Sequence, residues 1–141
     1  MELPNMHVLV PIDDSDPAEQ ALEYALAEYP DADITALHVI DPYETSVDAW
    51  FADQDYLADL EAEAETLLET ARERADDHGA SIDTDSVVGK PAREITDYVE
   101  EADVDEVVIG SHGRRGTSRV LLGSVAETVV RRAPVPVIVV R

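Results

Sequence analysis

Short apolar runs alternate with longer amphipathic segments along the whole chain. An apolar run bounded by turn residues predicts a strand, whereas apolar positions spaced by three and four predict a helix. No linker or low-complexity segment interrupts the alternation, which predicts an α/β fold with helices on both faces of a parallel sheet. The predicted strands are residues 7–12, 33–40, 81–88, 106–109 and 135–140, and the predicted helices are a first from 16 to 29, a long one ending at 78, a third from 91 to 102 and a last from 124 to 132.

Two of the predicted helices begin with capping residues. In the first, Asp16 is the expected N-cap, because a proline and a glutamate follow at the first and third helical positions. This assignment leaves Asp13, which follows the first strand, available for a ligand. In the last helix, Ser124 begins a Ser-x-x-Glu capping box, in which its hydroxyl would bond the N–H of Glu127. A bound phosphate would compete for the same donor.

Glycines follow the fourth predicted strand at a characteristic spacing. Gly110-Ser111-His112-Gly113 stands directly after it, and Gly123-Ser124 follows after nine intervening residues, at the start of the last helix. Glycine lets a ligand oxygen approach main-chain N–H groups, and a helix N-terminus adds unpaired donors and partial positive charge. A strand order of 3-2-1-4-5 would bring the Pro11-Ile12-Asp13 loop to the same edge, where ligands of such sheets bind. The pattern predicts a nucleotide phosphate site; turn glycines without a ligand are the alternative.

Charge is distributed unevenly along the 141 residues. The net charge of −22 comes entirely from residues 1–88, since residues 89–141 contain eight acids and eight bases. From Val107 onward six arginines stand against one acid, Glu127, and this cationic stretch, which contains the glycines, favours an anionic ligand. Lys90 is the only lysine, and so acidic a composition predicts a halophilic protein of a salt-rich cytoplasm and argues against nucleic acid as a partner.

Composition also excludes several kinds of functional site and segment. Without cysteine the chain has no disulfide, thiolate metal site or thiol nucleophile. No apolar stretch reaches the length of a membrane span, and residues 1–5 lack the features of a signal peptide, so we expect a cytoplasmic protein. Of the histidines, His38 is expected in the core with a hydrogen bond, His7 and His78 in structural or surface positions, and His112 at the nucleotide; no pair has metal-ligand spacing.

The last predicted strand is strongly apolar and is expected at an edge of the sheet, where it invites pairing with another chain. Its prolines at 134 and 136 lack N–H donors and share one lateral side. We therefore expect the valines at 135, 137 and 139 to face the fourth strand, leaving Ile138 and Val140 to pair outward. This arrangement predicts a two-fold homodimer.

The glycine spacing, taken with four further landmarks, resembles a known family. Gly110-x2-Gly113-x9-Gly123-Ser124 looks like the ATP-binding signature of the universal stress protein family. The resemblance covers essentially the whole chain, and its other landmarks are Val10-Pro11-Ile12-Asp13, Ala36-Leu37-His38-Val39-Ile40-Asp41, Gly89-Lys90-Pro91 and the run from Pro134 to Val140. It implies a single domain over residues 1–141, a flavodoxin-like or Rossmann-like three-layer fold with strand order 3-2-1-4-5, binding of ATP or a related adenine nucleotide, and a homodimer.

The resemblance also implies a set of site residues. Carried over by position, Pro11, Asp13 and Val39 would surround the adenine and ribose. The residues that would wrap the ribose and phosphates are Gly110, Ser111, His112, Gly113, Arg114, Arg115 and Gly116. Those that would offer main-chain N–H groups and one hydroxyl to the phosphates are Ser124, Val125 and Ala126, which Gly123 precedes. Arg114 and Arg115 stand where family members often have lysine, which keeps the charge and favours forked contacts.

Three functions are compatible with these residues. The first is a cytoplasmic, ATP-binding regulator or sensor of stress, because no nucleophile–base pair, metal cluster or pair of catalytic carboxylates is recognisable. The second is a slow ATP hydrolase or phosphotransferase that uses the same loop, with His112 or Asp13 as its base, although the Walker pattern is missing. The third is a dimeric interaction module without nucleotide. In either nucleotide-binding function, any Mg²⁺ would be held largely by phosphate oxygens and water.

Overall fold

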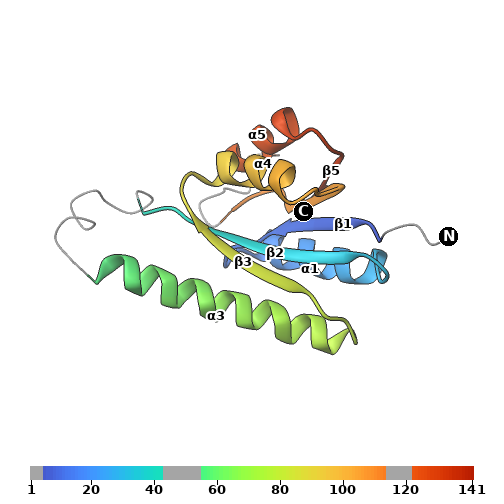
Figure 1. The fold of residues 1–141 in the computed structure, drawn as a ribbon, viewed down its shortest axis with the longest axis horizontal. Coiled ribbons are helices and arrows are strands. Elements are labelled where there is room, and N and C mark those ends of the chain that lie inside the picture. Colours follow the sequence, from blue (N-terminus) through green and yellow to red (C-terminus); the bar gives the residue numbers. More distant parts are fainter. Residues whose placement is uncertain (1–4, 43–54, 114–121) are drawn as a thin grey trace.

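The computed structural model describes residues 5–42, 55–113 and 122–141. They form a five-stranded parallel sheet in the order β3-β2-β1-β4-β5 (Figure 1), which confirms the predicted fold class and strand order. The strands are β1 His7–Pro11, β2 Asp33–Ile40, β3 Asp83–Val88, β4 Glu106–Gly110 and β5 Val137–Val140, and the helices are α1 Asp16–Glu28, α3 Tyr56–Asp77, α4 Pro91–Glu101 and α5 Ser124–Arg132.

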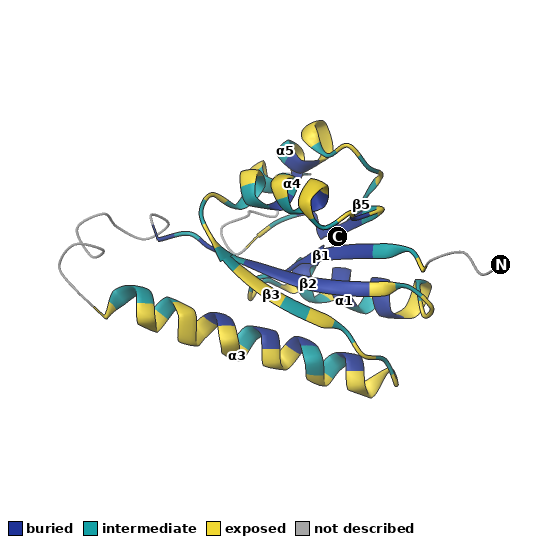
Figure 2. Ribbon diagram, viewed as in Figure 1, coloured by how far each residue is buried: buried dark blue, intermediate teal, exposed yellow. Residues whose placement is uncertain are grey.

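The helices lie in two layers on opposite faces of the sheet. α1 and α3 cover one face, and α4 and α5 cover the other (Figure 1). Successive side chains of a strand point to opposite faces, so in β1 Val8 and Val10 pack toward α1 and α3 while Leu9 packs toward α4 and α5. β1, β2 and β4 are the most buried strands, whereas β3, at an edge of the sheet, has no buried residue (Figure 2).

Two predicted helix caps are wrong by one residue. The N-cap of α1 is Ser15, whose hydroxyl accepts the N–H of Ala18 at 3.3 Å, and Asp16 is already helical. The N-cap of α5 is Gly123, whose carbonyl accepts the N–H of Glu127 at 2.8 Å, so the predicted capping box does not form. In both helices the residue expected to cap the N-terminus is already helical, and the residue before it is the cap.

The two sides of β5 are the reverse of those predicted. The carbonyl of Pro136 accepts the N–H of Val107 at 3.0 Å, and the carbonyl of Val140 accepts the N–H of Ser111 at 2.7 Å. Alternate residues of a strand direct their backbone groups to the same side, so Val140 bonds β4 and Val139 points to the outer side. The residues whose backbone groups point toward β4 are Pro136, Ile138 and Val140. Those whose backbone groups point outward are Val137 and Val139.

The prediction that Ile138 and Val140 pair outward is therefore wrong. That prediction assumed that the prolines lie on the side of the strand that makes no hydrogen bonds to β4, because they lack an N–H. Pro136 lacks an N–H but keeps its carbonyl, and that carbonyl is the group that β4 uses. The strand also begins at residue 137, two residues later than expected.

In the described ranges, none of the helices combines the length and the apolar character needed to cross a membrane.

Candidate functional site

The loops that follow β1 and β4 lie at the same edge of the sheet. The two strands are parallel neighbours, with Val8 beside Glu106 and Leu9 beside Val107, so their carboxyl ends lie together. Beyond those ends, a Cβ atom placed on Gly113 would lie 3.0 Å from Oδ2 of Asp13. The structure thus brings together two predicted site residues that are 100 positions apart in the sequence.

The N-terminus of α5 sits directly on the glycine loop, by which we mean residues 110–113. The N–H of Gly123 donates to the carbonyl of Ser111 at 2.6 Å. A Cβ on Gly123 would lie 3.2 Å from that carbonyl oxygen, 3.3 Å from Cα of His112 and 3.9 Å from the nitrogen of Gly113. Such close backbone contact suits glycine, which has no side chain to clash.

The first turn of α5 supplies anion-binding donors next to this contact. In any α-helix the N–H groups of the first turn have no acceptor within the helix, and the helix dipole makes that end partly positive. In α5 those residues are Ser124, Val125 and Ala126, of which Ser124 is exposed and Ala126 is buried. The arrangement can bind a phosphate or carboxylate through main-chain groups.

Two members of the glycine loop have packing roles. A Cβ on Gly110 would lie 2.6 Å from the carbonyl carbon of Pro17 and 2.7 Å from the nitrogen of Ala18, so the first turn of α1 packs on β4 there. Ser111 is 1% exposed, and its hydroxyl lies 2.9 Å from Nδ1 of His112. Gly110 and Ser111 thus form the base of the loop, whereas His112 is half-buried and Gly113 is exposed.

Pro11 and Val39 lie on the same face of the sheet as α5. Pro11 is buried and stands beside Leu37, and Val39 is two residues further along β2 and packs with the cluster under α4 and α5. His38, which precedes Val39 in β2, is a buried core residue, as predicted. Its Nδ1 lies 2.8 Å from the carbonyl oxygen of Ile12. Since a carbonyl only accepts, Nδ1 carries the proton, and the imidazole fixes the start of the β1 loop.

Ser15 is a residue of this region that the sequence reasoning missed. Its N–H donates to Oδ1 of Asp13 at 2.9 Å, and its hydroxyl donates to the same oxygen. The same hydroxyl lies 3.4 Å from the carbonyl oxygen of His112. A serine directly before a Pro-containing helix start was the available signal, but Asp16 fitted the expected cap pattern as well.

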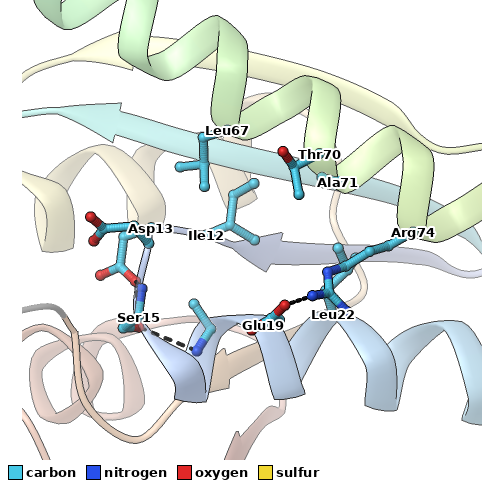
Figure 3. Close-up of a pocket in the computed structure, with 11 residues that line it drawn as sticks. Ile12, Asp13, Ser15, Glu19, Leu22, Leu67, Thr70, Ala71 and Arg74 are labelled. Atoms are coloured by element: carbon cyan, nitrogen blue, oxygen red, sulfur yellow. Dashed lines mark hydrogen bonds and ion pairs between the residues drawn. The ribbon is translucent and has the colours of Figure 1, made fainter.

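A cavity of about 190 Å³ opens beside this region, between α1 and α3 (Figure 3). It shares Asp13 and Ser15 with the loops described above, but neither Pro11 nor Val39 lines it. Arg74 of α3 crosses one end, where it forms ion pairs with Glu19 and, at 2.9 Å, with Glu23. The cavity therefore lies on the α1 and α3 face, across the sheet from α5.

Three predicted site residues, Arg114, Arg115 and Gly116, lie outside the described residues. In the part of the chain that is described, no group of three or more histidine, aspartate or glutamate side chains is arranged to hold a metal ion.

Comparison with known proteins now assigns the chain to a family. The model of the universal stress protein family matches residues 4–141. The chain belongs to the universal stress protein family. The relative named universal stress protein MJ0531 of Methanocaldococcus jannaschii is 34% identical to it over 95% of this chain and 81% of that protein.

Solved structures of the family share this fold. Universal stress protein UspA from Lactobacillus plantarum superposes with a TM-score of 0.82 and 30% identity, over 99% of this chain and 100% of that one. The Archaeoglobus fulgidus universal stress protein solved in complex with dAMP has a TM-score of 0.71 and 26% identity, over 96% and 98%. Another universal stress protein, solved in complex with cAMP, has a TM-score of 0.71 and 28% identity, over 96% and 97%.

Proposed function

We propose that this universal stress protein binds an adenine nucleotide, with ATP as the expected ligand, at the carboxyl ends of β1 and β4. One observation carries the proposal: Asp13, Gly113 and Gly123 converge where α5 begins, so a hydrogen-bond acceptor, an open backbone and a helix N-terminus adjoin one another. The dAMP and cAMP complexes of two relatives with the same fold support adenine as the base.

Different residues would contact the phosphates, the sugar and the base of the nucleotide. The phosphates would lie at the first turn of α5, on the N–H groups of Val125 and Ala126 and the hydroxyl of Ser124, with any Mg²⁺ held mainly by the phosphates themselves. Asp13 would face the sugar, because a carboxylate repels phosphate and accepts hydrogen bonds from hydroxyl groups. Pro11 and Val39 supply apolar surface for the base on the same face as α5.

Calorimetric titration of ATP, ADP and AMP into the protein in concentrated KCl tests the site. We expect saturable binding to the native protein and loss of binding in Gly113→Val, because its side chain would begin 3.0 Å from the Asp13 carboxylate and fill the space over the loop. Thr70→Phe is the matched control, since Thr70 is exposed and lines the cavity on the other face. Unchanged affinity in Gly113→Val with loss in Thr70→Phe would move the site to the α1 and α3 cavity.

We further propose that the nucleotide is held as a signal in the cytoplasm and is not turned over. The two candidate bases of the alternative function already have hydrogen-bonding roles: Asp13 accepts from Ser15, and His112 lies beside the Ser111 hydroxyl. Measurement of phosphate release from a large molar excess of ATP over protein tests this point, with His112→Ala as the comparison. Turnover that His112→Ala abolishes would favour the hydrolase instead.

A homodimer through the outer side of β5 is the proposed assembly. Val137 and Val139 direct their backbone groups outward there, and residues 122–141 contain three arginines and one acid, so repulsion between copies is weakest at this edge. Val139→Pro removes an outward N–H without removing a bond to β4, and it should convert a dimer to a monomer in sedimentation. A monomeric native protein at micromolar concentration would contradict the assembly.

Adaptation to high salt is the last part of the proposal. A net charge of −22 on 141 residues repels itself unless salt screens it. The melting temperature should rise between dilute and molar KCl by more than it does in sucrose of equal osmolality. An equal rise in both solutions would contradict charge screening as the cause.

A further inference from the structure

The hydroxyl of Ser15 lies where three segments of the site meet. It donates to Oδ1 of Asp13 in the β1 loop, accepts from the N–H of Ala18 at 3.3 Å in α1, and lies 3.4 Å from the carbonyl oxygen of His112 in the glycine loop (Figure 3 shows the first two segments). Ser15 is half-buried, so these contacts are partly shielded from water.

These contacts orient the carboxylate of Asp13. Oδ1 receives both the N–H and the hydroxyl of Ser15, which fixes the plane of the group. Oδ2 then faces the glycine loop, 3.0 Å from the position that a Cβ on Gly113 would take. A carboxylate offers about four acceptor positions, so Oδ2 can accept a hydrogen bond from a ligand hydroxyl in addition to the contacts that Asp13 already makes.

The group that Oδ2 would meet follows from its place beside α5. Gly113 adjoins Gly123, whose neighbours provide the proposed phosphate donors. In a nucleotide the part next to the phosphate is the ribose, and its hydroxyls are donors that suit a carboxylate oxygen.

We infer that Ser15 is a positioning residue for ribose recognition: it holds the Asp13 carboxylate so that Oδ2 accepts a ribose hydroxyl over Gly113. The inference rests on the proposed nucleotide site and adds to it a preference, set by Ser15, for ribonucleotides over nucleotides without sugar hydroxyls. A purely structural Ser15, one that only caps α1, is the competing explanation.

Three proteins and two ligands separate these explanations. The ligands are AMP and 2′,3′-dideoxy-AMP, titrated calorimetrically into native protein, Ser15→Gly and Ser15→Thr in concentrated KCl. Glycine is nearly as good an N-cap as serine, so Ser15→Gly removes the hydroxyl with little loss of helix capping, and threonine retains both functions. The midpoint of chemical unfolding of each variant checks that the fold is intact.

We expect native protein to bind AMP at least about tenfold more tightly than the dideoxy compound, as a hydrogen bond to a charged group implies. Ser15→Gly should lose about tenfold in AMP affinity and leave the dideoxy compound unaffected, while Ser15→Thr keeps the native preference. An equal effect of Ser15→Gly on both ligands, or no effect, overturns the role of Ser15 and leaves the nucleotide site standing. Failure of native protein to bind either ligand overturns the proposed function itself.

Discussion

The loop after β1 and the loop after β4 end at the same edge of the sheet, but they are held in different ways. In the β1 loop side chains make the contacts, since Ser15 bonds both the Asp13 carboxylate and the first turn of α1. In the β4 loop the backbone makes them, through the Gly123 N–H and the close approach of Gly110 to Pro17. The first loop should therefore be sensitive to loss of a polar atom, and the second to gain of a single carbon.

The largest effect is expected from Gly110→Ala. The added Cβ would lie 2.6 Å from the backbone of Pro17, and a backbone atom at the start of a packed helix cannot move aside cheaply. We expect the free energy of unfolding to fall by about 2 kcal/mol or more, measured by chemical denaturation.

Gly123→Ala is the control for that measurement. Its Cβ would meet backbone atoms at 3.2 and 3.3 Å, which requires a shift of only a few tenths of an ångström. We expect a smaller loss, roughly 1 kcal/mol. Equal losses in the two variants would break the argument that Gly110 is fixed by packing against α1.

Ser15→Ala tests the loop held by side chains. The helix loses its N-cap and Asp13 loses a donor, which should lower the free energy of unfolding by about 1 kcal/mol, again by denaturation. Ser15→Thr should restore most of it, because threonine also caps and donates. If Ser15→Thr were as destabilised as Ser15→Ala, the hydroxyl contacts would not be the cause.

The smallest effect concerns the opposite end of the sheet, where Tyr29 donates a hydrogen bond to Glu106 at 2.7 Å. Burial, helped by that bond, raises the pKa of Tyr29 from 10.0 to about 12. The folded-state pKa lies above the unfolded one, so this stabilisation is present below pH 10 and is lost as the pH rises toward 12.

Unfolding followed from pH 9 to 12 should therefore show falling stability, and Tyr29→Phe should flatten part of the fall. Tyr98 accounts for another part, because burial and Asp85 raise its pKa to about 12 as well. AMP affinity at constant pH should be the same in Tyr29→Phe and native protein. A change in affinity would contradict the separation between this end of the sheet and the nucleotide site.

Many of the helices and strands could be predicted from short segments of the sequence. The residues of β2 and α5 were predicted at their observed bounds, since apolar spacing and turn residues are properties of short segments. The glycine spacing was read directly from the sequence, and the strand order was implied by the resemblance to the universal stress protein family and is confirmed. The convergence of Asp13 with Gly113 follows from that order, because β1 and β4 are neighbours.

The misjudged residues were not decided by the local pattern alone. Asp16 and Ser15 both fitted an N-cap, and the one that is used, Ser15, also lies against the carbonyl of His112, which is 97 residues away in the chain. Pro136 was assigned to the outer side of β5 by its missing N–H, whereas the register with β4 puts its carbonyl to use.

What the sequence determined by itself was therefore the series of elements and the chemical types gathered at their ends, because backbone preference and apolar period act over a few residues. The tertiary structure alone decided which hydroxyl orients Asp13, which glycine is required for packing, and which side of β5 points outward. Each of these depends on the distance between atoms of separate segments, and only the packed sheet and its helices set those distances.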